Sequence, residues 1–420
     1  MVWCSINVNY TSPNGSIDSS NPRPLRVLML LHNIFVRHVR VRRLSDSLAQ
    51  DGHYVDVISL ASDDGSDQSR PPFVRCYTLK KTRSRHEGLG HILDWASTVV
   101  SMFYHLNRLD IKNRYDVIHV HNMPDFLVFT ALFQRLMGKP VILHIGDPMP
   151  ELGESKLNAG PDHILIRGLK LLEQASCRFS THVITALESF KRQLVLRGTR
   201  ADKITVIMNA PDSRLFAAEL LEAEAKKDPS VYTVLYVGTV ATRYGLETMV
   251  RALPLLRQQI PNIRFKIVPK IIDEGKGLKD CFALADELSV SDLMYVTSPV
   301  PIEKMPGVMA SADVGIYPAI RNRHMDWALS LKIPEMALAK LPIVSTRLTV
   351  LEELYGDQAI AFHDSEDFEV LASRIIQIHD SPEYKKSLVS NAYNKASQND
   401  WSHQYAIYKR LLTQLLGRPV

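Results

Sequence analysis

The sequence predicts two successive α/β domains, each built on a doubly wound parallel sheet. The chain of 420 residues is too long for one ordinary core, since a domain typically holds about 150 residues. Its short apolar runs are rich in β-branched residues and continuous rather than alternating, as buried parallel strands require. Stretches of helical periodicity separate these runs, which is the pattern of βαβ units.

The first domain is expected over residues 24–216, after a leader of Ser, Asn, Pro and Gly at 1–23. Helical periodicity is clearest at 42–52 and 126–139. The expected strands are residues 26–31, 54–60, 116–120, 140–145, 182–185 and 204–208.

The second domain is expected over residues 232–397, after a charged linker at 217–231. An amphipathic helix at 401–416 dominates the final segment, 398–420. Two doubly wound domains that face each other leave a cleft at the carboxyl ends of their strands, where ligands bind in such folds. The expected strands are residues 233–237, 264–268, 293–297, 314–317, 342–346 and 359–362.

Composition excludes several classes of protein. Hydrophobic residues make up 45% and charged residues 23% of the chain, as in soluble globular proteins. A net charge of +5 is insufficient to propose nucleic-acid binding. The four cysteines have no CxxC spacing, so we expect a reducing compartment and neither a disulfide framework nor a zinc site. No secretory signal or spanning helix is expected.

The turn after strand 233–237 is a candidate anion site. Gly238 allows a backbone to approach a ligand closely. Arg243 lies just before a helix that starts near Gly245, and free N–H groups at a helix start favour an anion, most simply a diphosphate. The alternative is an ordinary strand–helix turn with an exposed arginine. A GxGxxG dinucleotide fingerprint is absent.

A second candidate follows strand 314–317, where a helix is expected to begin around Ser330. Lys332 near a helix N-terminus is electrostatically unfavourable unless an anionic ligand binds there. Glu335 lies on the same helical face and can accept hydrogen bonds from sugar hydroxyls. The alternative is an ordinary i,i+3 ion pair between the two side chains.

Polar residues also end two strands of the first domain. His119 and His121 share a strand face, but without a third ligand at fixed spacing a metal site is weakly supported. We expect Asn122 and Asp125 to order the turn and His121 to lie at the cleft edge. Asp147 is interpreted either as a residue that orients a hydroxyl or a base, or as a structural turn residue.

Two segments suggest contact with anionic or apolar surfaces. Residues 35–43 are rich in arginine and can meet a phosphate-bearing acceptor or an anionic membrane, or form a solvated helix face. The apolar stretch at 95–104 can dock on a membrane or form a buried helix.

From residue 25 to about residue 416 the chain resembles the retaining GT-B glycosyltransferases of the GT4-like family, the glycosyl transferases group 1. Each matching motif is weak alone, but all of them occur in the family's order. The motifs lie at residues 37–55, 116–129, 139–151, 183–198, 207–216, 237–253, 311–318 and 329–345.

The resemblance implies two Rossmann-like domains that face each other across a cleft. It implies a nucleotide-sugar donor on the second domain, an acceptor on the first, no metal or other cofactor, and a terminal helix that returns to the first domain. By position, Arg243 and Lys332 would bind the donor diphosphate, and Glu335 would bind the ribose. Gly238 and Thr239 would line the phosphate loop. The retaining displacement implied for the family needs no strong protein nucleophile.

The sequence departs from the family pattern at two positions near the candidate catalytic residues. The family's first motif glutamate is replaced by Trp327, with Asp326 beside it. Many relatives have a histidine where this chain has Gly146, and His144 would lie about 6–7 Å deeper along the strand. Our candidates are therefore Asp147, His121 and Asp326.

The leading interpretation is a cytoplasmic retaining transferase of a hexose or similar sugar. Its expected acceptor is a lipid-linked or growing cell-surface polysaccharide, reached at the inner membrane face. The departures at Gly146 and Trp327 motivate an alternative, a non-catalytic GT-B subunit that binds a nucleotide sugar or a partner enzyme. A nucleotide-sugar epimerase is a third possibility, for which we assign no residues.

Overall fold

The computed structural model describes residues 23–61, 73–79, 89–157, 160–217, 227–269 and 276–420. Most of the predicted leader and linker therefore lies outside the described residues. Within that part of the chain, no helix is long and apolar enough to cross a membrane.

Seven parallel strands form the first sheet, in the order β3-β2-β1-β4-β5-β6-β7. The five inner strands are buried over most of their length and mostly apolar, as strands covered on both faces require. The strands are β1 (Arg26–Ile34), β2 (Tyr54–Leu60), β3 (Val74–Leu79), β4 (Val117–His121), β5 (Val141–Ile145), β6 (His182–Thr185) and β7 (Ile204–Val206).

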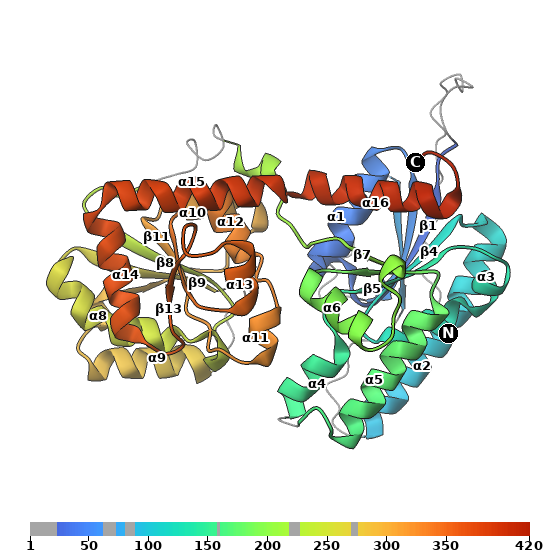
Figure 1. Ribbon diagram of the computed structural model, residues 1–420, viewed down its shortest axis with the longest axis horizontal. Coiled ribbons are helices and arrows are strands. Elements are labelled where there is room, and N and C mark those ends of the chain that lie inside the picture. The colour runs from blue at the N-terminus through green and yellow to red at the C-terminus, as the bar shows by residue number, and fades with distance from the viewer. Residues whose placement is uncertain (1–22, 62–72, 80–88, 158–159, 218–226, 270–275) are drawn as a thin grey trace.

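Helices cover both faces of this sheet (Figure 1). One face packs against α1 (Val39–Gln50), and the other against α2 (Leu89–Asn113), the 3-10 turn Asp125–Ala131 and α5 (Ile164–Phe179). The remaining helices of this half are α3 (Leu132–Leu136), α4 (Met149–Leu157) and α6 (Glu188–Leu196).

Six parallel strands form the second sheet, in the order β10-β9-β8-β11-β12-β13. The strands are β8 (Tyr232–Gly238), β9 (Ile263–Pro269), β10 (Met294–Val296), β11 (Val314–Tyr317), β12 (Ile343–Thr346) and β13 (Ala361–His363). Two apolar clusters, one on each face, join the strands to the covering helices.

One face of the second sheet is covered by α8 (Leu246–Gln259), α9 (Lys276–Glu287) and α14 (Phe368–Asp380). The other face is covered by α10 (Met305–Ala310), α12 (Lys332–Leu338), α13 (Thr349–Leu354) and α15 (Pro382–Gln398). A short helix, α11 (Arg323–Trp327), lies in the connection after β11.

The last helix, α16 (Trp401–Leu416), leaves the second half and covers the first sheet (Figure 1). Its indole N–H at Trp401 donates to the Ser47 hydroxyl of α1 (2.8 Å). Tyr408 is fully buried in the same apolar cluster as α1 and β1. The return of the terminal helix, which the resemblance implies, is therefore present.

Every strand predicted above is present, but β3 was not predicted. It reads VRCYTL and lies at the sheet edge beside β2, where partly exposed positions admit polar residues. The helix expected at 126–139 is also wrong in extent. Residues 125–131 form a 3-10 turn, and only Leu132–Leu136 are α-helical.

The strand order reverses once in each sheet, between β1 and β4 and between β8 and β11. At such a point the connections from neighbouring strands diverge to opposite faces, and a crevice opens at the carboxyl ends of the strands. Both groups of predicted site residues follow strands at or beside these two reversals.

Candidate functional site

At the carboxyl end of β8 the chain turns tightly. Gly238 has φ 154°, and a side chain there would meet the Tyr236 hydroxyl at 3.1 Å. That hydroxyl donates to the backbone carbonyl of Thr239 (2.7 Å), which fixes the turn from beneath. Gly238 therefore presents backbone rather than side chain at the start of the predicted phosphate loop, and the exposed Thr239 follows it.

The turn continues into α8 through Gly245, which adopts a left-handed φ of 63° and caps the helix without a side-chain hydrogen bond. A Cβ at Gly245 would overlap the carbonyl oxygen of Pro318, so only glycine fits. The carbonyl of Arg243 accepts a hydrogen bond from the N–H of Ile320 (3.0 Å). The loops after β8 and β11 are thus joined at the strand reversal.

The second predicted pair, Lys332 and Glu335, lies in the first turn of α12. The helix begins at Lys332, two residues after the expected start at Ser330. The Lys332 ammonium lies 2.6 Å from a Glu335 carboxylate oxygen, and Glu335 is buried while Lys332 is partly exposed. The ion pair given as the alternative is therefore formed.

Arg43 of α1 links the two sheets electrostatically. Its guanidinium donates to the carbonyl of Ala210 and lies over the Trp401 ring, 5.6 Å from the ring centroid. Burial lowers the pKa of Arg43, while the charge of Glu335, from the second sheet, opposes that shift. The buried Glu335 carboxylate thus interacts with cations from both halves of the chain.

Asp326 has both carboxylate oxygens engaged. One oxygen accepts from Arg321 at 3.0 Å, and the other accepts from the N–H and hydroxyl of Thr349 at 3.1 and 3.3 Å. These bonds tie α11 to the first residue of α13. Asp326 therefore holds the loop after β11 together.

Three histidines stack at the carboxyl ends of β4 and β5. The His119 and His121 ring centroids are 4.2 Å apart, and the His119 and His144 centroids are 5.6 Å apart with nearly parallel planes. The Tyr408 hydroxyl lies 3.1 Å from Nδ1 of His119. His121 is buried, so the expectation that it lies at the cleft edge is wrong. The ring of His38, the residue before α1, lies against it with centroids 6.4 Å apart.

Burial keeps these imidazoles neutral. It lowers the pKa of His119 to about 3 and holds the pKa values of His121 and His144 well below their usual range. Their ligand atoms all lie within 4.8 Å of one another, and no other described group of three His, Cys, Asp or Glu residues qualifies as a metal-binding cluster.

A metal ion lies in the plane of each imidazole that it binds, whereas His119 and His144 are almost parallel, with an interplanar angle of 14°. The guanidinium of Arg40 adds a positive charge beside His144. Both features favour a packed imidazole stack over a cation site.

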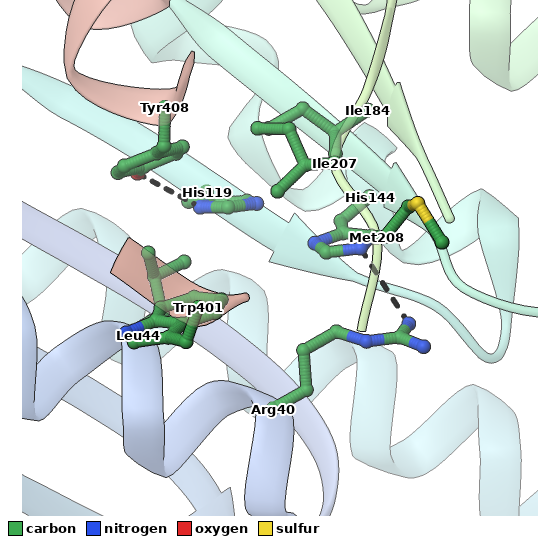
Figure 2. Close-up of a pocket in the computed structure, with 9 residues that line it drawn as sticks. All are labelled: Arg40, Leu44, His119, His144, Ile184, Ile207, Met208, Trp401 and Tyr408. Carbon is green, nitrogen blue, oxygen red and sulfur yellow. Dashed lines mark hydrogen bonds between the residues drawn. The ribbon is translucent and has the colours of Figure 1, made fainter. Parts of the chain in front are cut away.

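Arg40 projects from the first turn of α1 to the end of β5 (Figure 2). Its Nη1 lies 3.5 Å from Nε2 of His144, to which it can donate. A Cβ at position 146 would overlap that same Nη1, so a side chain there would displace the guanidinium. Asp147 follows Gly146 with an exposed side chain, and its charge opposes the lowering of the Arg40 pKa by burial.

Asn122 orders the loops after β4 and β5, as predicted. Its amide nitrogen donates to the Asp147 carbonyl (2.7 Å) and to Asp125 (3.1 Å), and its amide oxygen accepts from the Gly146 N–H (2.9 Å). Beneath them, Arg197 forms ion pairs with Glu151 and Glu173. This buried group supports the loop that carries Asp147.

Two family models match the chain in sequence order. The model described as Glycosyltransferase Family 4 matches residues 38–214, and the model described as Glycosyl transferases group 1 matches residues 231–381. Together they contain both candidate sites.

The chain belongs to the GT4-type glycosyltransferases.

A curated relative of this GT4-type glycosyltransferase is the D-inositol 3-phosphate glycosyltransferase of Pseudarthrobacter chlorophenolicus. The two are 22% identical over an alignment of 389 residues, and the match covers 88% of this chain and 88% of the relative.

Solved structures with the GT-B fold superimpose over nearly the whole chain. Sucrose-phosphate synthase of Thermosynechococcus elongatus covers 94% of this chain and 99% of its own, with a TM-score of 0.74 and 17% identity. The HepE protein of Anabaena, solved with UDP and glucose, covers 93% and 100%, with a TM-score of 0.67 and 16% identity. These matches confirm the GT-B fold expected from the sequence.

The GT4-type glycosyltransferase therefore brings Gly238, Thr239 and Arg243 to one edge of the second sheet, where the Lys332–Glu335 pair follows the neighbouring strand. Its three predicted catalytic residues have different surroundings. Asp147 is exposed after β5, His121 is buried in β4, and Asp326 is hydrogen-bonded within the loop after β11. Sequence reasoning marked the arginine-rich segment 35–43 but did not single out Arg40 or Arg43 within it. Their signal, arginines in the first turns of a helix without an acidic neighbour, was present in the sequence.

Proposed function

We propose that this glycosyltransferase binds a nucleotide-sugar donor at the second sheet and transfers the sugar to an acceptor hydroxyl. We further propose that the anomeric configuration is retained and that no metal or other cofactor takes part. One observation carries the proposal: the Arg243 loop and the loop before Lys332 and Glu335 are joined at the reversal between β8 and β11, by the hydrogen bond from Ile320 to Arg243. The HepE structure, of the same fold, holds UDP and glucose.

In this proposal the negative charge that develops on the leaving diphosphate is the focus of catalysis. Arg243, Lys332 and the start of α8 offer positive charge or N–H groups where that charge appears, and such fixed donors stabilise a transition state. Gly238 and Thr239 let the backbone approach the phosphates. Glu335 accepts hydrogen bonds from the ribose hydroxyls, as an ionised carboxylate can.

The remaining predicted residues have supporting tasks in this scheme. Asp147, exposed at the edge of the first sheet, orients the acceptor hydroxyl. His121 acts as a positioning residue through the imidazole stack, and Asp326 positions the loop after β11. A retaining displacement in which the acceptor attacks on the leaving-group side needs no protein nucleophile.

We also propose that the acceptor is lipid-linked and is reached at the cytoplasmic face of a membrane. The α2–α3 face, defined as Tyr104, Ile111, Leu132, Phe133, Leu136 and Met137, is apolar and solvent-exposed. Phe103 and Phe133 join the two elements, with ring centroids 5.6 Å apart. The exposed cations Arg108, Lys112 and Arg135 lie on the same helices, which suits an anionic lipid surface. Within the apolar stretch 95–104, Tyr104 is exposed on this face, whereas Met102 is buried in the core.

The donor proposal is tested by a thermal-shift screen of the full chain against UDP, GDP, ADP and CMP and their common sugars. Selective stabilisation by one nucleotide is expected, followed by a product whose anomeric configuration, read by NMR, matches the donor's, and whose rate is unchanged by EDTA. A product of inverted configuration would contradict retention. Inhibition by EDTA would contradict the proposal that no metal takes part. Donor binding with no product for any acceptor would favour the non-catalytic subunit.

Membrane contact is tested separately by sedimentation with phosphatidylcholine vesicles, with and without phosphatidylglycerol. Leu136→Glu and Ile111→Glu should lower the bound fraction on anionic vesicles. Val370→Glu, at an apolar site of similar chemistry on α14, is the control. Equal binding of all three variants would contradict the proposed face.

A further inference from the structure

The guanidinium of Arg40 has no carboxylate partner within 4 Å among the described residues. Its one hydrogen-bond contact is His144, and its Nε is enclosed without a partner. Asp147 is the one acid whose charge acts on it, and does so from a longer distance. Arg40 is partly exposed as a residue, but its Nε is enclosed. An enclosed part of a cation without a partner lowers the stability of a fold, so folding alone does not explain this arginine.

Local electrostatics make the position still less favourable. Arg40 lies in the first turn of α1, which contains no acidic residue, and the helix dipole disfavours cations there. The nearby rings of His38, His119, His121 and His144 carry no negative charge that could compensate. An anion bound beside Arg40 would remove both costs at once.

The geometry leaves the guanidinium at the rim of the first sheet. Gly146, at the end of β5, has no side chain, and any Cβ there would occupy the position of Nη1. The guanidinium of Arg40 occupies the space that a side chain at position 146 would fill. Figure 2 shows Arg40 extended past the histidines to the end of the strand. The next residue, Asp147, is exposed.

We propose that Arg40 and Gly146 form an oxyanion subsite that binds a phosphate or carboxylate group of the acceptor. The inference rests on the proposed function, because that function assigns Arg243 and Lys332 of the second sheet to the donor diphosphate. Arg40 belongs to the first sheet and faces the acceptor side. A planar guanidinium can bind two oxygens of such a group side by side. The acceptor is therefore an anionic carbohydrate or lipid-linked sugar.

The test uses the full chain saturated with the nucleotide that stabilises it, so that the donor site is filled. Inorganic phosphate is then titrated by isothermal calorimetry into the wild type, Arg40→Gln and Gly146→Ala. Both variants should weaken phosphate binding at least tenfold and leave nucleotide affinity unchanged. Arg42→Gln, an exposed arginine on the same helix, should change neither.

Gly146→Ala keeps the charge and displaces the guanidinium, so it tests the subsite even if Arg40→Gln fails to fold. Equal phosphate affinity in wild type and Gly146→Ala would overturn the inference. So would a loss of nucleotide affinity in Arg40→Gln, because Arg40 would then serve the donor diphosphate.

Three further binding measurements identify the source of the anion and distinguish failure of the Arg40 subsite from failure of the donor proposal. Acetate in place of phosphate distinguishes a carboxylate acceptor from a phosphorylated one; tight binding of either supports the subsite. UDP-glucuronate binding tenfold tighter than UDP-glucose in the wild type alone would assign the anion to the donor sugar and overturn the acceptor assignment. If no nucleotide binds, the donor proposal fails, while phosphate titration of the free chain still reports on Arg40.

Discussion

The hydroxyl of Tyr408 lies 3.1 Å from Nδ1 of His119, although the two residues are 289 positions apart in the chain. Tyr408 comes from α16, and His119 from the centre of the first sheet. Both side chains are fully buried. The last helix of the chain therefore supplies a polar contact to the core of the first sheet and orders the imidazole stack beneath Arg40.

Tyr408→Phe should lower the free energy of unfolding by about 1–3 kcal/mol, because the His119 nitrogen would lose a buried partner. Equilibrium unfolding in guanidinium chloride measures this. Tyr393→Phe on α15, where the ring is partly exposed, serves as the control and should change stability little. Equal stability of both variants would mean that a water replaces the hydroxyl.

Arg243→Ala and Lys332→Ala should each weaken binding of the donor nucleotide by about 1.5–3 kcal/mol, the scale of a charged hydrogen bond. Calorimetric titration of the nucleotide gives this number directly. Arg251→Ala, an exposed arginine further along α8, is the matched control. Unchanged affinity in both site variants would remove the proposed donor site.

Glu335→Ala should weaken nucleotide binding while leaving the affinity for pyrophosphate unchanged, because the proposed contact is to the ribose. The comparison of the two ligands is made by calorimetry. Melting temperature without ligand should change little, since Lys332 is partly exposed and can be solvated after the pair is lost. A large fall in melting temperature would instead make Glu335 a structural residue.

Asp326→Ala should lower the free energy of unfolding by about 0.5–2 kcal/mol, because the first N–H of α13 loses its acceptor. If Asp326 is a positioning residue, kcat should fall moderately and Asp326→Asn should restore part of it, since an amide oxygen can still accept from Thr349. A complete loss of kcat in Asp326→Asn, with normal stability, would instead indicate direct participation in catalysis.

Asp125 should make stability fall as pH rises towards neutrality. Burial raises its pKa from 3.8 to about 7, against the hydrogen bond from Asn122. The folded state therefore holds a proton that the unfolded state loses near pH 4, and stability declines between about pH 4 and 7, by at most about 1.4 kcal/mol per pH unit. Asp125→Asn should remove this slope from urea unfolding measured at several pH values. An unchanged slope would assign it to Glu173, whose pKa burial also raises to about 7.

The strands and their alternation with helices were predictable because buried parallel strands leave continuous apolar runs. β3 left no such run, since Arg75 and Thr78 occupy an edge position where the Arg75 guanidinium pairs with Asp56 at 2.8 Å. The helix over 126–139 failed for a different reason. Apolar periodicity does not distinguish a 3-10 turn from an α-helix over two turns.

The second-sheet candidates were predictable because charged residues that follow a strand end stand out against an apolar background. The first-sheet site was not, since its arrangement depends on tertiary packing. The burial of His121 could not be read from the sequence, because it comes from packing between segments that are distant in the chain. The relation between Arg40 and Gly146 joins a helix to a loop 106 positions later, and no local pattern encodes the contact.

The two crossings between the sheets lie side by side. Pro211, before the first crossing, accepts a hydrogen bond from the N–H of Trp401, after the second (2.9 Å). Ser213 and Asp400 are bonded at 2.5 Å in the same place, and Gln404 accepts from the Met208 N–H. The two segments that connect the halves are therefore joined to each other by hydrogen bonds. Any change in the angle between the two halves must therefore either preserve these hydrogen bonds or break them together.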